Sequence, residues 1–479
     1  MDYKIIGHSL ANTVIDMIQA FFPNEKYGEL GVDETSPRFL ESRYENGLVS
    51  ARFFVNSRVE AETEWMCNDS DIAYAIKRSI YKLWVEDKDL PWGILTGIRP
   101  AKIASGLLTY GMKDAEIISH MQEKYMVSPE RAILCTQVAK AERELLERGS
   151  GTGYSLYIGI PFCPSKCLYC SFTSYPVDKY AGTTDRYIDA VKKELDYVVR
   201  HFGGVVPDTI YIGGGTPTSL DDASFIKLLE YVGGSFDLSK VKEYTVEAGR
   251  PDTISSEKLD IMRGFGIGRI SINTQSVNDK TLKQIGRGHS AAEFIASYEL
   301  ARKKGFGHIN IDIILGLPGE CVTDVENTFK AVTNLEPEEV TVHTLAIKRA
   351  SRLKAELTST ALAASQQMES YLRISKDYMD NFGYKPYYMY RQKNSLGNFE
   401  NVGYRKDGFG CLYNVQIMEE SCTIAATGAG AISKFVNSET DRIERAFNVK
   451  DVNDYIERIE EMMQRKNAAY RKAFNLGVE

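Results

Sequence analysis

Three cysteines lie close together in the chain, Cys163, Cys167 and Cys170, directly after the apolar run Ser155–Ile160. Their C-x3-C-x2-C spacing on a loop lets three thiolates converge on one small inorganic centre, and thiolates are the usual ligands of iron–sulfur clusters. A cubane contains four irons, so three protein ligands leave one iron open to a group from outside the chain. The spacing therefore predicts a [4Fe–4S] cluster with one open iron.

A structural zinc site is the alternative to a cluster. Such a site normally uses four protein ligands, and no fourth Cys or any His stands near the loop. The remaining cysteines are scattered and are interpreted as small core residues; they are Cys67, Cys135, Cys321, Cys411 and Cys422. The sequence therefore favours the cluster over zinc.

Strand-type and helix-type segments alternate from Tyr154 onward. The six short β-type runs are Ser155–Ile160, Thr209–Ile212, Glu243–Glu247, Arg269–Asn273, Asn310–Leu315 and Glu339–Thr344. The amphipathic stretches between them are Thr184–Phe202, Asp222–Val232, Glu257–Phe265, Ala291–Lys304 and Asp324–Leu335. Repeated βα units predict an α/β fold with a parallel sheet, here a partial (β/α)6 barrel with an open side.

Three regions are expected: an N-terminal α+β domain at 1–150, the partial barrel at 151–350, and a C-terminal α+β extension at 351–479 that covers the substrate. The expected elements of the first are helices at Ala11–Phe21, Ile72–Trp84 and Pro129–Arg148, and a hairpin of Arg38–Tyr44 and Leu48–Val55 turned at Glu45-Asn46-Gly47. The glycine-rich stretch 148–153 is typical of a linker. The expected C-terminal elements are helices at Ala361–Asn381 and Val452–Lys466, with loops or short strands at Ser395–Gly410.

Polar residues stand in or after the later barrel strands, towards the end where βα barrels place function. The second strand runs into Gly213-Gly214-Gly215-Thr216-Pro217-Thr218, and glycines let backbone atoms approach a ligand closely. Glu247 could bind a cation, and Gln275 and Asp312 could form hydrogen bonds with nucleoside hydroxyls. Arg287 suits a carboxylate. For each of the four side chains, a structural salt bridge or cap is the alternative.

A cysteine loop of this kind opening a βα barrel resembles the radical S-adenosylmethionine (SAM) superfamily, whose reduced cluster cleaves SAM to methionine and a 5′-deoxyadenosyl radical. Other segments are similar to the oxygen-independent coproporphyrinogen III oxidase (dehydrogenase) family, over roughly residues 154 to 435. They are Tyr157–Cys163, Gly213–Thr218, Asn310–Gly319 and Gly428–Ser433, with Gly97–Pro100 typical of the longer HemZ-type branch. By position the resemblance implies SAM contacts at Tyr157, Tyr169, Gly214, Gly215, Thr216, Glu247, Gln275, Arg287, Asp312, Ala346 and Ile432.

The resemblance implies oxidative decarboxylation of two propionates of coproporphyrinogen III to vinyl groups, giving protoporphyrinogen IX in anaerobic haem biosynthesis. Two departures leave that reaction and a second SAM site open: Ser171 and Phe172 follow Cys170 where the best-known members have a further cysteine, and Gly159 replaces their His. A haem chaperone of a sister branch is one alternative. Its haem-binding His-Asn pattern corresponds here to Gly397-Asn398-Phe399, without His. A haem-opening radical SAM methyltransferase is another.

A tetracarboxylate substrate such as a porphyrinogen, or a haem-type tetrapyrrole, calls for cationic side chains at the barrel mouth. The candidates are Arg99, Arg391 and Arg405. The aromatic cluster Tyr384, Tyr387, Tyr388 and Tyr390 is compatible with a flat macrocycle pocket, although core packing is the favoured interpretation. Such an enzyme also requires an electron donor of the ferredoxin or flavodoxin kind.

Composition agrees with a globular chain and narrows its partners. The 479 residues carry a formal net charge of −7, with 43% hydrophobic and 26% charged residues. The sequence contains no long run of Lys and Arg, so nucleic-acid binding is not expected. The N-terminus lacks the pattern of a secretory signal, and no stretch reaches the roughly 18 apolar residues of a membrane span. A cytoplasmic protein is therefore expected, in which cysteines stay reduced.

Overall fold

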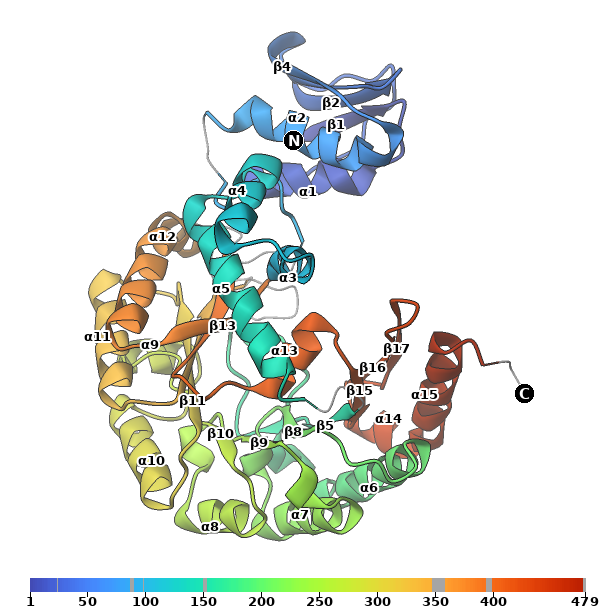
Figure 1. The fold of residues 1–479 in the computed structure, drawn as a ribbon. Helices are drawn as coiled ribbons and strands as arrows, with labels where there is room; N and C mark the ends of the chain where they lie inside the picture. The colour runs from blue at the N-terminus through green and yellow to red at the C-terminus, as the bar shows by residue number, and fades with distance from the viewer. Residues whose placement is uncertain are drawn as a thin grey trace. The chain divides into compact units, whose positions relative to one another are not determined.

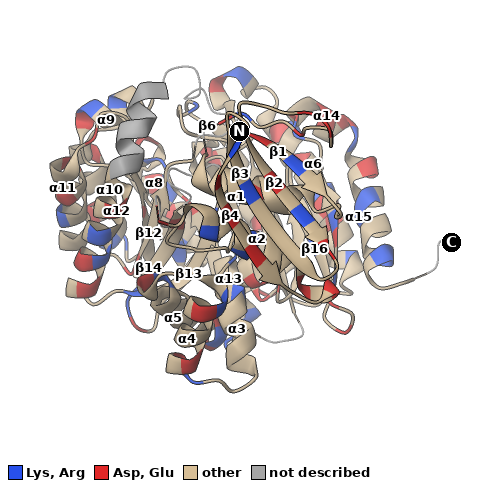
Figure 2. Cartoon of the chain, turned by 90° about the horizontal axis from the view of Figure 1, so that it is seen from above, with Lys and Arg blue, Asp and Glu red and all other residues tan. Residues whose placement is uncertain are grey.

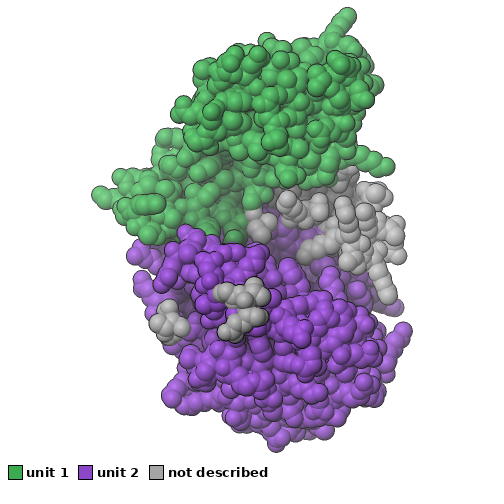
Figure 3. Space-filling model, turned by 90° about the vertical axis from the view of Figure 1, so that its right-hand side faces the viewer, with its two compact units in different colours: residues 1–139 green, residues 140–479 purple. Residues whose placement is uncertain are grey.

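The computed structural model describes residues 1–23, 25–86, 90–97, 99–149, 153–346, 358–392 and 399–476. The chain forms two compact units, Met1–Ala139 and Lys140–Glu479 (Figure 3). The expected three regions, with boundaries after residues 150 and 350, stay a prediction.

A four-stranded sheet forms the centre of the N-terminal unit. Its strands, in spatial order, are β1 (Asp2–Ile6), β2 (Arg38–Glu45), β3 (Leu48–Val55) and β4 (Arg58–Met66). The predicted hairpin is β2–β3, and its turn residues Asn46 and Gly47 have φ of 49° and 80°, as a type I′ turn requires. The helices of this unit are α1 (Ala11–Phe21), α2 (Ile72–Trp84), α3 (Ala101–Thr109) and α4 (Asp114–Tyr125), and α5 (Pro129–Leu146) begins in it and ends beyond Ala139. The apolar faces of α1 and α2 pack with the sheet into one hydrophobic core.

Six parallel strands form the centre of the second unit and confirm the expected partial barrel. They are β5 (Tyr154–Ile160), β8 (Thr209–Gly214), β9 (Glu243–Glu247), β10 (Arg269–Ser271), β11 (Ile309–Leu315) and β12 (Glu339–Thr344). Each strand pairs with the next in chain order, which is how a βα barrel is wound. The connecting helices are α6 (Thr184–His201), α7 (Asp222–Ser235), α8 (Ser256–Gly264), α9 (Asp279–Gln284), α10 (Ala291–Lys303) and α11 (Val322–Asn334). Figure 1 shows these helices along the outer side of the curved sheet.

C-terminal strands extend both edges of this sheet, so the first and last barrel strands do not pair with each other. At one edge β14 (Glu400–Arg405) lies between β12 and β13 (Lys385–Arg391). At the other, β15 (Thr423–Thr427) pairs with β5 and is followed by β16 (Ile432–Asn437) and β17 (Arg442–Phe447). The C-terminal helices are α12 (Thr358–Asn381), α13 (Leu412–Glu419), α14 (Val452–Glu457) and α15 (Ile459–Ala473). The single helix expected at Val452–Lys466 was wrong, because Arg458, with φ −106° and ψ 25°, leaves the helical conformation and separates α14 from α15.

The amino ends of the barrel strands hold a buried charged network. Arg269 pairs with Glu339, whose other oxygen lies 2.8 Å from His308 Nε2. Arg405 lies opposite Glu339 in the sheet and pairs with Glu144 at 2.6 Å. The sequence-based candidate Arg405 is therefore wrong as a residue of the barrel mouth, since it is held at the opposite end of the strands.

Charges of both signs are interspersed along the outer helices (Figure 2). Among the described residues, no helix is long and apolar enough to cross a membrane. The absence of a nucleic-acid partner stays a prediction.

Candidate functional site

The cysteine loop leaves the carboxyl end of β5 and is held by backbone hydrogen bonds on two sides. On one side, the Gly215 N–H donates to Ile160 O at 2.8 Å, and the Thr216 N–H donates to Phe162 O at 2.6 Å. On the other side, the Leu168 N–H donates to Ile285 O at 3.0 Å. The loop is thus fixed between the turn that follows β8 and the segment that follows α9.

The three cysteines are free thiols at this edge of the sheet, with Cys167 buried and Cys163 and Cys170 half-buried. Burial raises the pKa of the Cys163 thiol to about 11, although the hydrogen bond with Thr216 Oγ1 at 3.4 Å opposes this. Burial also raises the pKa of Cys170. Iron binding at neutral pH must therefore release protons from these thiols.

Within the described residues, no three His, Cys, Asp or Glu side chains are grouped as ligands of a single metal ion. Each thiolate of a cubane binds a different iron, so the ligands of a cluster do not need to converge on one point. Three thiols without a fourth ligand are the donor set that a [4Fe–4S] cluster with an open iron uses, and the residues present fit that group.

The turn Gly213–Gly215 packs against the cysteine loop and Glu247 so closely that side chains are excluded. A Cβ on Gly213 would lie 2.7 Å from the Glu247 carboxyl carbon, and one on Gly215 would lie 2.5 Å from Phe162 O. The Glu247 carboxylate accepts from Tyr211 Oη at 2.7 Å and from the Gly214 N–H at 3.1 Å. Burial raises its pKa to about 7, with the Asp312 charge adding to the rise and both hydrogen bonds opposing it.

Asp312 is held by two asparagines at the centre of the sheet. Its oxygens accept from Asn273 Nδ2 and Asn310 Nδ2, both at 2.7 Å. His343 Nε2 lies 3.7 Å from Asp312, and His343 Nδ1 is 3.1 Å from Tyr390 Oη. Burial acts to raise the pKa of Asp312, but His343 and Asn310 outweigh it and the pKa is lowered. Asp312 is therefore a fixed anion within β11.

Arg287 joins the loops after β9 and β10. Its Nη2 donates to Gly249 O at 3.1 Å and to Asn273 O. Its Nε is buried without a hydrogen-bond partner among the described residues. The guanidinium also acts on the pKa values of Tyr169 and Cys170. A donor without a partner beside the cysteine loop fits an anionic group of a bound cofactor.

Gln275 has an unusual backbone, with φ of 72°, a conformation that costs energy for a residue with a side chain. Its N–H donates to Asp312 O and its carbonyl accepts from the Ile314 N–H, both at 3.0 Å. The chain bulges after β10 ends at Ser271 and rejoins β11 here. This bulge, rather than a continuing strand, turns Asn273 towards Asp312, which corrects the strand predicted as far as Asn273.

Four further residues predicted to contact SAM lie on the cysteine loop or on strands of the barrel sheet and the segments next to them. The Tyr157 hydroxyl is 3.0 Å from where a Cβ of Gly214 would stand, and the ring lies parallel to that of Tyr413. Tyr169 lies half-buried on the cysteine loop. Ala346 follows β12, and Ile432 is the first residue of β16. Contact of these residues with SAM stays a prediction.

Sequence reasoning missed Tyr211, Asn273, His343 and Arg250. Arg250 Nη1 lies 3.5 Å from Cys167 Sγ, although 83 residues separate the two in the chain. The position of Arg250 just after Glu247 at a strand end was the available signal. Its pairing with a cysteine was not readable, because it depends on how the loops fold over one another.

The substrate-facing candidates divide. Arg391 is the last residue of β13, at the end of the sheet where the parallel barrel strands have their carboxyl ends and where the cysteine loop lies. Arg99 belongs to the other unit. Tyr384 and Tyr387 are buried and donate to Pro337 O and Glu339 near the amino end of β12. Tyr390, which contacts His343, is the tyrosine of this group at the site edge.

Comparison with known proteins shows the family of the chain. Residues 157–332 match the model of the radical SAM superfamily. The chain is 40% identical over 385 residues to the oxygen-independent coproporphyrinogen-III oxidase-like protein HemZ of Bacillus subtilis, covering 78% of this chain and 76% of that protein. The chain belongs to this branch of the radical SAM superfamily.

Two further relatives define the neighbourhood of this branch. The heme chaperone HemW of Bacillus subtilis is 36% identical over 198 residues, 40% of this chain and 51% of that protein. The structure of coproporphyrinogen III oxidase (HemN) from Escherichia coli, described as a radical SAM enzyme, superposes with a TM-score of 0.54 at 22% identity, over 70% of this chain and 78% of that one. The latter confirms the fold.

Membership of the superfamily confirms the predicted cofactors, a [4Fe–4S] cluster and SAM. The assignment of Cys163, Cys167 and Cys170 to the cluster, and of the other residues to SAM, stays a prediction.

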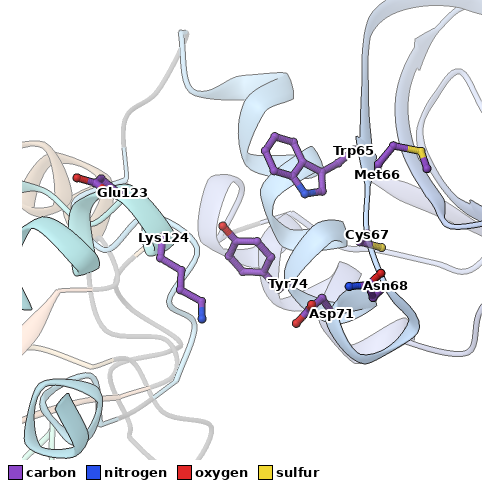
Figure 4. A pocket seen from close by; sticks show the side chains of 8 residues that line it. All are labelled: Trp65, Met66, Cys67, Asn68, Asp71, Tyr74, Glu123 and Lys124. Carbon is purple, nitrogen blue, oxygen red and sulfur yellow. The ribbon is translucent and has the colours of Figure 1, made fainter. Parts of the chain in front are cut away.

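A separate cavity of about 590 Å³ lies in the N-terminal unit (Figure 4). Its lining consists of Trp65, Met66, Cys67, Asn68, Asp71, Tyr74, Glu123 and Lys124. None of the predicted site residues belongs to it, and Arg78 stacks on the Trp65 ring at 3.9 Å.

Proposed function

We propose that the chain is a coproporphyrinogen III dehydrogenase that converts two propionate side chains to vinyl groups, giving protoporphyrinogen IX. Each conversion removes one hydrogen atom, carbon dioxide and one electron. This electron balances the one that cleavage of SAM consumes, so it can return to the oxidised electron carrier and no further oxidant is needed. The bound cluster and SAM supply the radical chemistry that removes the hydrogen atom. The names of the HemZ and HemN relatives support this proposal.

The single observation that carries the proposal is the ring of polar groups joined to the cysteine loop at one sheet edge. We propose that Cys163, Cys167 and Cys170 hold the cluster. Glu247 would then accept from the ammonium of SAM, and Arg287 would donate to its carboxylate. Asp312, fixed by Asn273 and Asn310, would accept from ribose hydroxyls. These groups are held before the ligand arrives, so little ordering is needed at binding.

Arg391 and Tyr390 are the proposed substrate-side residues. Arg391 supplies a permanent positive charge for a propionate. The Tyr390 hydroxyl supplies a polar group hydrogen bonded to His343, whose other ring nitrogen lies 3.7 Å from Asp312. The proposed substrate, a porphyrinogen, and an electron donor of the ferredoxin or flavodoxin kind complete the set of partners, and a cytoplasmic location suits all of them.

Anaerobic turnover tests the proposal. The reconstituted chain is incubated with dithionite, SAM and coproporphyrinogen III, and both 5′-deoxyadenosine and protoporphyrinogen are quantified, with Cys167→Ala as the control. Formation of both products in the intact chain and of neither in the variant is expected. Release of 5′-deoxyadenosine with no vinyl product would show that the substrate is another molecule.

A haem carrier is the second candidate, because heme chaperones named HemW match part of the chain. The segment that corresponds to their haem-binding pattern, Gly397-Asn398-Phe399, carries no His, and Gly397 and Asn398 lie outside the described residues. Stoichiometric retention of added haem, without consumption of SAM in the turnover assay, would favour the carrier. Conversion of haem to a methylated or ring-opened product would favour the methyltransferase alternative.

A further inference from the structure

Arg250 is a buried cation that touches the cysteine loop without being a cluster ligand. It is 3% exposed. One face of its guanidinium points to the loop, with Nη1 at 3.5 Å from Cys167 Sγ and 3.3 Å from Ser165 O. Its other face forms a two-point pair with Asp252, with Nε–Oδ1 at 2.8 Å and Nη2–Oδ2 at 2.7 Å. The guanidinium is therefore fixed between a carboxylate and a thiol.

The order of these charges gives the arrangement a direction. Asp252 lies on the far side of Arg250 from Cys167, so the positive end of the ion pair faces the thiol. Arginine stays protonated at any working pH, and both groups are largely removed from water, which strengthens their effect on a nearby charge.

A cluster becomes more negative by one charge when it is reduced. Hydrogen bonds to its sulfurs and nearby charge are among the factors that set its reduction potential. A donor and a positive charge beside one ligating sulfur stabilise the reduced form more than the oxidised form. Radical SAM chemistry begins from the reduced form, so a residue of this kind determines which donors can deliver the electron.

We propose that Arg250 is a positioning residue that raises the reduction potential of the cluster through Cys167, with Asp252 partly offsetting its charge. This inference concerns the cofactor of the superfamily and does not depend on the substrate under Proposed function. Its test is therefore independent of turnover with coproporphyrinogen III.

A purely structural role is the competing explanation, because Arg250 also bonds Ser165. Its Nη1 and Nη2 each lie 3.2 Å from Ser165 Oγ, which in turn is 3.3 Å from Gly286 O. Ser165→Ala removes these loop contacts and leaves the charge in place. It is the matched control for the loss of the guanidinium.

The experiment is an EPR-monitored redox titration of the reconstituted full chain without substrate. Arg250→Gln should lower the midpoint potential by at least about 59 mV, which corresponds to a tenfold change in a one-electron equilibrium. Arg250→Lys, which keeps the charge, should recover most of the shift. Asp252→Asn should move the potential the opposite way, upward, while Ser165→Ala should leave it unchanged.

An unchanged potential in Arg250→Gln at full iron content overturns the proposal, as does an equal fall in Ser165→Ala. If Arg250→Gln does not retain iron, Asp252→Asn decides the question. Its potential must rise, and an unchanged or lower value contradicts the proposed role.

Discussion

At the scale of single residues, the candidate site depends on side chains that are missing as much as on those present. The turn after β8 approaches the cysteine loop through backbone atoms alone, and its third glycine has two carbonyl oxygens where a Cβ would stand. A Cβ on Gly215 would lie 2.5 Å from Phe162 O and 2.8 Å from Ile160 O. Both neighbours are backbone atoms and cannot rotate away.

Gly215→Ala should therefore displace the cysteine loop and lower the iron content after reconstitution, with a stability loss of about 1–3 kcal/mol from overpacking. Iron and sulfide analysis together with thermal unfolding measures both effects. The control is Gly234→Ala in α7, where nothing lies within 4 Å of the added carbon. It should keep full iron and gain about 0.5–1 kcal/mol, as a helical alanine does. Equal iron content in both variants would contradict the packing argument.

Glu247 gives a prediction about pH. Its pKa is raised to about 7, chiefly by burial, and the proposed role requires the ionised form. Protonation removes the acceptor for an ammonium group, so the Kd for SAM should increase about tenfold per pH unit below 7 and be constant above about pH 8. Isothermal titration between pH 5.5 and 8.5 tests this. Glu247→Gln should bind weakly with no such slope, and a slope that persists in this variant would assign the titration to another group.

The residues found from the sequence and those missed differ in a physical way. The cysteines follow β5, Glu247 ends β9 and Asp312 lies within β11, so their placement follows from the strands of the parallel sheet. Arg250 and His343 act through partners on other elements, Cys167 and Tyr390, and those pairings depend on loop packing that no periodicity encodes. Arg405 was also predicted from the sequence to lie at the barrel mouth, but the register of the β12–β14 pair places it at the opposite end of the strands.

At the scale of elements, the six barrel strands were predictable because each is a short apolar run followed by an amphipathic helix. Strand β4 was missed because its burial pattern is almost wholly exposed, so it has no apolar face to reveal it. The way β13–β14 and β15–β17 extend the two sheet edges was also unreadable, since edge pairing depends on which edge remains free after the barrel folds.

One buried ion pair ties these edge elements to the barrel. Glu194 on α6 pairs with Lys466 on α15, with side chains 0% and 2% exposed, and it also accepts from the Gly428 N–H at 2.8 Å and from Asn448 at 2.9 Å. The carboxylate thus joins α15 and the turn between β15 and β16 to the first barrel helix.

Lys466→Met should destabilise the second unit by about 3–5 kcal/mol, because it leaves Glu194 charged and buried without its cation. Urea unfolding monitored by far-UV circular dichroism measures the change. The control is Lys472→Met on the same helix, whose partner Glu444 is near the surface and whose loss should cost at most about 1 kcal/mol. Restoration of stability in Lys466→Met combined with Glu194→Gln would confirm the cause, and equal losses in the two single variants would contradict it.

At the scale of the whole molecule, length alone indicates several domains, but it does not indicate where one ends. The boundary of the two compact units falls at Ala139, within α5, and the linker expected near residues 148–153 stays a prediction. A continuous helix gives no compositional signal of a boundary. Only the contacts made on either side of Ala139 distinguish its two parts.

The end of α5 that belongs to the second unit carries Glu142. We expect the ionisation of this residue to make the stability of the chain depend on pH. Glu142 is 1% exposed, and burial together with the neighbouring Glu419 raises its pKa from 4.5 to about 9. The folded state therefore keeps this proton up to about pH 9, while the unfolded state releases it above about 4.5. Because the folded state binds more protons in this interval, the free energy of unfolding should fall as pH rises, by up to about 1.4 kcal/mol per unit.

Glu142→Gln removes the titrating group and keeps its shape, so its unfolding free energy should depend less on pH between 6 and 9 than that of the unchanged chain. At pH 8.5 the variant should be the more stable of the two, since its unfolded state has no carboxyl at this position that gains free energy by releasing a proton. Urea unfolding at each pH gives the comparison, with the exposed Glu230→Gln as the control that should follow the parent curve. If the unfolding free energies of all three chains changed in parallel with pH, the proton would not be held at Glu142. The pair of Glu142 and Glu419 would then not govern how the stability depends on pH.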